Sequence, residues 1–173
     1  MSVQLAKKYN EIEKIKQEFL LKIETISPEK LNTVPAEGKW SLGQVYFHLY
    51  YAESGTIKVI QKNLRENKIK NKSGISDSLR SVLLKAVMRS PLKIKAPAVA
   101  SKVPDSITFD EIKEYFAMNS ENYRQLLNDL PMELEDKQIF KHPLAGLFNI
   151  EQTIHFVREH YLHHEKQVNA LLK

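Results

Sequence analysis

The stretch WSLGQVYFHL, Trp40–Leu49, contains the clearest helix start in this sequence. Ser41 is the expected N-cap, and Gln44 three residues later can complete a capping box. Trp40 and Val45 stand at the two positions of a hydrophobic staple. These signals predict a long helix from about Ser41 to Leu64, with His48 two turns from its start.

Three further long helices are predicted from apolar spacing and from similar start and stop signals. They run from about Val3 to Ile26, from Thr108 to Leu130 and from near Asn149 to the C-terminus. Between the second and third lie a shorter helix, about Asp77 to Arg89, and an extended crossover that contains three prolines. This pattern predicts an all-α fold, a four-helix bundle with a long crossover and an extra short helix. A chain of 173 residues suits a single domain over residues 1–173.

The composition limits the chemistry that the protein can use. The chain has no cysteine, so disulfides, thiolate nucleophiles and zinc-thiolate sites are excluded, and any metal must be held by His, Asp, Glu or backbone oxygen. No apolar run reaches 18 residues and the N-terminus is charged, so we expect neither a membrane span nor a signal peptide. A cytoplasmic protein is the simplest interpretation.

Positive charge gathers in one segment. Between Ile57 and Lys102, twelve basic residues stand against two acidic ones, so that the segment carries +10 and the rest of the chain −5. Such a segment could attract an anionic substrate, a membrane surface or nucleic acid, although a solvated connection is the plainer interpretation. It contains no aromatic residue on which unpaired bases could stack, which argues against nucleic acid as a partner.

The last helix carries EHYLHHEKQV, residues 159–168, with three histidines in five positions. On a helical wheel, His164 lies about 30° and His160 about 70° from the centre of the apolar stripe, so one ion could meet both side chains. His163, about 130° away, and His155, about 150° away, should face water. A pair one turn apart is a weak signal by itself. A third ligand would have to come from another helix, and His48 is the only histidine in the first 141 residues.

KWSLGQVYFHL, residues 39–49, followed 112 positions after its histidine by HYLHH, resembles the DinB-like superfamily of four-helix bundles. The stretch HPLAGLFNIEQTIHFVREHYLHHEKQ is similar to the last loop and helix of that family, including the glutamine three positions after the last histidine. The resemblance covers essentially the whole chain, and its specific part is about fifteen residues. It implies a divalent metal, zinc or nickel for example, bound by His48, His160 and His164.

The resemblance also implies a reaction class, either metal-dependent hydrolysis or thiol-dependent transfer with a low-molecular-weight thiol such as bacillithiol or mycothiol as cosubstrate. The nucleophile would be a metal-bound water, with a pKa of about 7, or a metal-bound thiol, and no catalytic side chain is identified. Asn119, Tyr51 and Gln167 are candidates for contacts with a ligand or with a small-molecule substrate. For Asn119 a plain interhelical hydrogen bond is the stronger alternative, and for Tyr51 it is packing at the rim of the core.

The sequence leaves three functions open. The first is the metal-dependent enzyme, the second a non-catalytic metal-binding or interaction bundle, and the third a nucleic-acid binder that uses the basic segment. The metal, the substrate, and the choice between a monomer and a homodimer also stay open.

Overall fold

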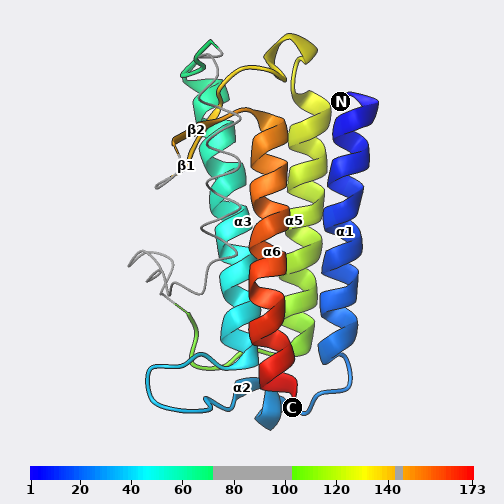
Figure 1. Ribbon diagram of the computed structural model, residues 1–173, viewed down its shortest axis with the longest axis vertical. Coiled ribbons are helices and arrows are strands. Elements are labelled where there is room, and N and C mark those ends of the chain that lie inside the picture. Colours follow the sequence, from blue (N-terminus) through cyan, green and yellow to red (C-terminus); the bar gives the residue numbers. More distant parts are fainter. Residues whose placement is uncertain (72–102, 143–145) are drawn as a thin grey trace.

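The computed structural model describes residues 1–71, 103–142 and 146–173, and four long helices lie side by side along its longest axis (Figure 1). They are α1 (Val3–Ile23), α3 (Leu42–Arg65), α5 (Phe109–Asp129) and α6 (Ile150–Leu172). Helix α3 packs against α5 and α6, and α1 packs against the same two helices. The prediction of an all-α bundle is confirmed. None of the helices in the described ranges combines the length and the apolar character needed to cross a membrane.

The direction of the helices agrees with a long crossover. In Figure 1 the colours run from the same end of the bundle along both α3 and α5, whereas α1 and α6 run the opposite way. Two parallel neighbours in a bundle require a connection that returns along its length. The shorter helix predicted at about residues 77–89, and most of the basic segment, lie outside the described residues.

All three predicted start signals of the later helices form complete capping boxes. In each, the cap side chain accepts from the backbone N–H three residues on, and that residue's side chain accepts from the backbone N–H of the cap. The pairs are Ser41 with Gln44, Thr108 with Glu111, and Asn149 with Gln152. The helix starts were predictable because each of these signals is local to four residues.

Short elements in two parts of the chain were not predicted. The first helix ends at Ile23 rather than Ile26, and Ser27 then caps a short helix α2 (Pro28–Asn32) with Pro28 in its first turn. Asn32 at the end of α2 accepts from the backbone N–H of Ile107 and donates to its carbonyl, at 2.9 and 3.0 Å. A Cβ on Gly43 would lie 2.5 Å from the Ile107 side chain, so the close approach of these segments requires glycine there.

The second of these parts precedes α6. A 3₁₀ helix η1 (Met132–Leu134) is followed by two short strands, β1 (Phe140–His142) and β2 (Gly146–Phe148). They pair antiparallel, with Phe140 opposite Phe148 and His142 opposite Gly146. This hairpin lies at the end of the bundle where α6 begins (Figure 1).

Within the largely apolar interior formed by the described residues, one polar layer connects all four long helices. The predicted stripe of α1 is buried as expected, but Lys16 lies within it and is buried too. The Lys16 ammonium lies 3.4 Å from the Glu53 carboxylate on α3 and donates to Ser120 on α5. Glu53 also accepts from Asn119 on α5 and from Tyr161 on α6. A buried charge is tolerated only with such partners.

The capping box of α3 gives a first testable expectation. Ser41 is fully buried, and its hydroxyl accepts from the Gln44 N–H at 3.2 Å. Ser41→Ala should therefore lower the free energy of unfolding by about 0.5–2 kcal/mol, as for other lost N-caps. Because His48 lies two turns into this helix, metal affinity should fall as well. Urea denaturation and a metal titration measure the two effects, and a destabilised variant with unchanged metal affinity would show that the cap only stabilises the fold.

Candidate metal centre

The three histidines singled out in the sequence lie together where α3 faces α6. His48 comes from α3, and His160 and His164 come from consecutive turns of α6. Each offers one ring nitrogen, and these nitrogens all lie within 4.8 Å of one another. His48 and His164 are buried, whereas His160 keeps part of its surface accessible. The structure thus brings residues 112 positions apart in the chain into one cluster.

The three rings form an almost equilateral triangle. Their centroids are 5.0 Å apart for His48 and His160, 4.9 Å for His48 and His164, and 4.8 Å for His160 and His164. The Nε2 atoms of His48 and His160 are 3.1 Å apart. Two imidazole nitrogens bound to one zinc ion at 2.0–2.1 Å would be separated by roughly 2.8–3.4 Å for bond angles of 90–109°. The separation between His48 and His160 falls in this range, and three histidines within 4.8 Å are a donor set that suits one divalent ion.

Each ring of the triad is held by a different neighbour. The Trp40 ring packs on His48 with centroids 4.9 Å apart, and Phe156 stacks on His160 at 5.9 Å. The side-chain oxygen of Gln167 lies 2.9 Å from Nδ1 of His164. Since an amide oxygen only accepts, Nδ1 carries the proton and Nε2 of His164 keeps its lone pair for a ligand. Gln167 was considered from the sequence as a candidate for contact with a ligand or a substrate, and its side chain contacts His164.

The environment keeps the two triad imidazoles on α6 neutral. Burial, with the neighbouring histidines, lowers the pKa of His160 well below its ordinary value. Burial and His48 lower the pKa of His164 to about 3, against a weaker opposing effect of Gln167. A metal binds neutral imidazole, so at neutral pH no proton has to leave these rings before an ion binds.

Asn119 and Tyr51, the other candidates from the sequence, have contacts with residues outside the triad. The amide of Asn119 donates to the Tyr50 carbonyl at 2.9 Å and to Glu53 at 3.1 Å, which is the interhelical bond that the sequence left as the alternative. The Tyr51 ring stacks against Phe47 one turn away on α3. His163 is exposed, as expected.

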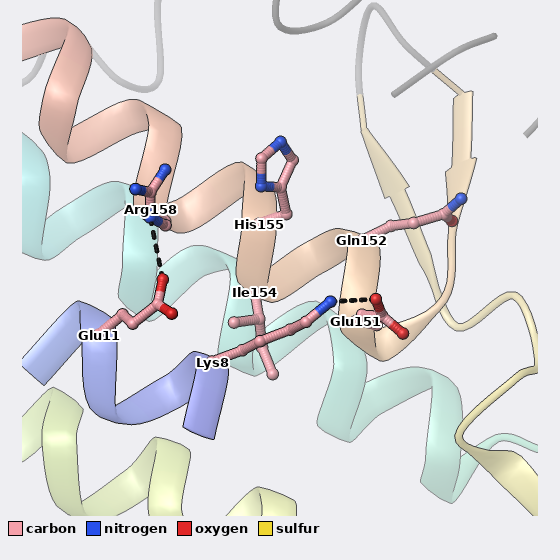
Figure 2. A pocket seen from close by; sticks show the side chains of 7 residues that line it. All are labelled: Lys8, Glu11, Glu151, Gln152, Ile154, His155 and Arg158. Atoms are coloured by element: carbon pink, nitrogen blue, oxygen red, sulfur yellow. Dashed lines mark hydrogen bonds and ion pairs between the residues drawn. The ribbon is translucent and has the colours of Figure 1, made fainter. Parts of the chain in front are cut away.

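His155 was expected to face water, and it lies at the surface of α6 beside α1. It is half-buried and lines a surface pocket of about 330 Å³ between α1 and α6 (Figure 2). Ion pairs join Lys8 to Glu151 and Arg158 to Glu11 across this pocket. The wheel could not predict this, because it does not show that α1 packs beside this face of α6. None of the triad histidines lines the pocket, so it is separate from the metal centre.

A further histidine, which was not predicted to have a role, is connected to the triad through Phe156. His142, at the end of β1, is buried against Phe156, with ring centroids 4.7 Å apart, and Phe156 in turn stacks on His160. Burial lowers the pKa of His142 to about 4, so its ring is also neutral at pH 7. In the sequence, His142 is visible only as the first residue of HPLAGLF, just before the last helix. Its position beside Phe156 could not be predicted, because it depends on the hairpin of β1 and β2.

The comparison with known proteins agrees with this arrangement. The family model of the DinB superfamily matches residues 11–168. The chain belongs to the DinB superfamily. The match covers α3 and α5 completely, most of α1 and α6, and all three histidines of the triad.

Among relatives, this DinB protein is similar to the uncharacterized protein YuaE of Bacillus subtilis (strain 168). The two are 23% identical over 146 residues, which cover 84% of this chain and 85% of YuaE. No solved structure gives a significant match. The comparisons therefore support the family, and the chemistry has to be argued from the triad.

Proposed function

We propose that this DinB protein is a divalent-metal-dependent enzyme that acts on a small molecule, by hydrolysis or by transfer of a low-molecular-weight thiol. The observation that carries the proposal is the triangle of His48, His160 and His164, with a 3.1 Å separation between two of its nitrogens. Zinc and nickel are the metals we favour, because both accept imidazole ligands.

Three histidines leave room for a further ligand at the ion. Structural zinc sites usually close with four protein ligands, whereas catalytic sites use three and keep one position open. A divalent ion held there would supply positive charge that activates a water or a thiol for attack. His160 is only partly buried, so the triad lies near the surface of the bundle rather than at its centre.

The protein's own residues would orient the ligands rather than react. Gln167 fixes the tautomer of His164, and Trp40 and Phe156 restrict the rings of His48 and His160. Such contacts around a metal ligand typically change metal affinity or activity 10–100-fold when removed. The chain has no cysteine, so in a transferase the thiol would come from the cosubstrate.

The test is metal analysis followed by turnover. Protein purified without a histidine tag should contain close to one equivalent of a divalent ion. A panel of esters, and of electrophiles offered with small thiols, should then show turnover that a chelator removes and the added ion restores. Protein without metal affinity would contradict the proposal. Bound metal without turnover across the panel would favour the alternative, a non-catalytic metal-binding or interaction bundle.

A further inference from the structure

The triad depends on how two helices are placed relative to each other. His48 is the only one of its members on α3, and both others are on α6. A small rotation or slide of α6 against α3 would therefore change the distance from His48 to both partners together. Metal sites lose affinity when their ligands are displaced by about 0.5 Å or more. Something in the protein has to fix this pair of helices.

A buried hydrogen bond joins the same two helices beside the triad. The Tyr161 hydroxyl on α6 donates to Oε2 of Glu53 on α3 at 3.0 Å, in the interior of the bundle. Tyr161 directly follows His160 in the chain, and Glu53 is five residues, about 7.5 Å along the helix, beyond His48. Around the helix axes, Glu53 lies about 140° from His48 and Tyr161 about 100° from His160. The triad and this bond thus connect α3 and α6 at two different faces.

Both ends of the bond are themselves fixed. Glu53 is held by Lys16 on α1 and by the Asn119 amide on α5. The Tyr161 ring lies edge-on against Phe19 at 5.5 Å and against Phe116 at 5.9 Å. Removal of a donor from a buried carboxylate strongly lowers the free energy of unfolding, because the desolvation of the carboxylate is then uncompensated. A movement of α6 that separated His160 and His164 from His48 would also have to stretch this bond.

We infer that Tyr161 is a positioning residue of the metal centre, and that the hydrogen bond from its hydroxyl to the side-chain oxygen of Glu53 sets the register of α3 against α6 in which the three imidazoles converge. The inference rests on the proposed function only in that the triad binds a metal. It requires no contact of either residue with the ion or with a substrate.

The chain offers a matched control for the hydroxyl of Tyr161. Tyr46 is also fully buried and packs against the same two rings, Phe19 at 5.8 Å and Phe116 at 5.9 Å. Its hydroxyl donates to the Phe19 carbonyl at 2.7 Å, so it joins α3 to α1 rather than to α6. Tyr161→Phe and Tyr46→Phe each remove one buried hydroxyl from the same part of the core.

A second variant separates stability from metal affinity. Tyr161 and Asn119 both donate to Oε2 of Glu53, whereas Lys16 lies near Oε1. Glu53→Gln can keep its carbonyl oxygen at the Oε2 position and so keep the bond to Tyr161, while it loses the charge that faces Lys16. This variant should lose at least as much stability as Tyr161→Phe but should retain the register of α6.

The experiment measures the Kd of the metal-free protein for Zn²⁺ by chelator competition, and the urea midpoint of each variant in the absence of metal. Tyr161→Phe should weaken zinc binding about tenfold, the lower end of the effect of contacts around metal ligands. Tyr46→Phe and Glu53→Gln should stay within about twofold of wild type, although their urea midpoints also fall. The visible absorption of bound Co²⁺ should change only in Tyr161→Phe.

The possible failures are distinguishable. Wild-type protein that binds no zinc would overturn the metal centre and this inference with it. Zinc affinity unchanged in Tyr161→Phe would overturn the inference alone. Zinc affinity that falls in proportion to the urea midpoint across all three variants would also overturn it, because the effect would then reflect general loss of stability.

Discussion

Alanine at His48, His160 or His164 should reduce the affinity for a divalent ion on the order of a hundredfold or more, at or above the upper limit for contacts around the ligands. Each substitution removes one of three nitrogens that lie within 4.8 Å of one another, and two imidazoles alone hold an ion poorly. Elemental analysis of purified protein and titration of the metal-free protein measure the effect. Turnover, where a substrate is found, should disappear in the same three variants.

The neighbouring histidines serve as controls for this prediction. His163 is exposed and packs edge-on against His164 with ring centroids 5.0 Å apart, so His163→Ala should change metal affinity only slightly. His155 lines the pocket between α1 and α6, and His155→Ala should leave metal binding near wild type. Metal retained by His48→Ala but lost by His163→Ala would contradict the assignment of the triad.

Local signals explain why much of the fold could be predicted from the sequence. Each capping box is contained in four residues, and each apolar stripe repeats within one helix, so neither depends on the rest of the chain. The short helix α2 was missed because the first helix was predicted to run to Ile26, whereas it ends at Ile23 and Ser27 then caps α2. The hairpin of β1 and β2 was missed because strands of three residues carry too little periodicity.

The candidate site was predictable to the extent that it follows from helix faces. The wheel separated His160 and His164 from His163, and His48 stood alone as a partner from another helix. The resemblance to the DinB-like superfamily then implied that these three histidines bind one metal ion. The contacts of Trp40 and Phe156 with the triad depend on packing between segments far apart in the chain, which no helical wheel contains.

The polar layer in the core was missed although the sequence carries a signal for it. Lys16 falls within the apolar stripe of α1, between Ile12 and Phe19, and Glu53 falls between Leu49 and Ile57 on α3. A charged residue at a core position needs a partner of opposite charge, so one such residue on each of two helices predicts a buried pair. The pair was not predicted because only the apolar residues of each stripe were considered, whereas the signal is the charged residue within it.

Lys16→Met should lower the free energy of unfolding by about 3–5 kcal/mol, the range for removing one partner of a buried ion pair. The side chains of Lys16 and Glu53 are only 2% and 1% exposed, so Glu53 would be left as a buried charge. Methionine fills much of the same volume, so the loss reflects charge more than packing. Urea denaturation of the metal-free protein gives the value.

Lys22→Met is the matched control on the same helix. Lys22 pairs with Glu165 at 2.8 Å, and its ammonium lies over the Phe19 ring, but the two paired side chains are 24% and 38% exposed. A solvent-exposed pair contributes about 0–1 kcal/mol, so this variant should be close to wild type. Equal losses in the two variants would show that burial adds nothing to the contribution of the Lys16 pair.

The double variant Lys16→Met with Glu53→Gln tests the cause directly. If the loss in Lys16→Met comes from the uncompensated carboxylate, the double variant should be more stable than the sum of the two single losses predicts. Glutamine removes the charge while its oxygen can still accept from Tyr161 and Asn119. Neighbours that share one network typically show such couplings of about 0.5–3 kcal/mol. Strictly additive losses would mean that Lys16 stabilises the bundle through its other contacts, the hydrogen bond to Ser120 and the ion pair with Glu13, and not through Glu53.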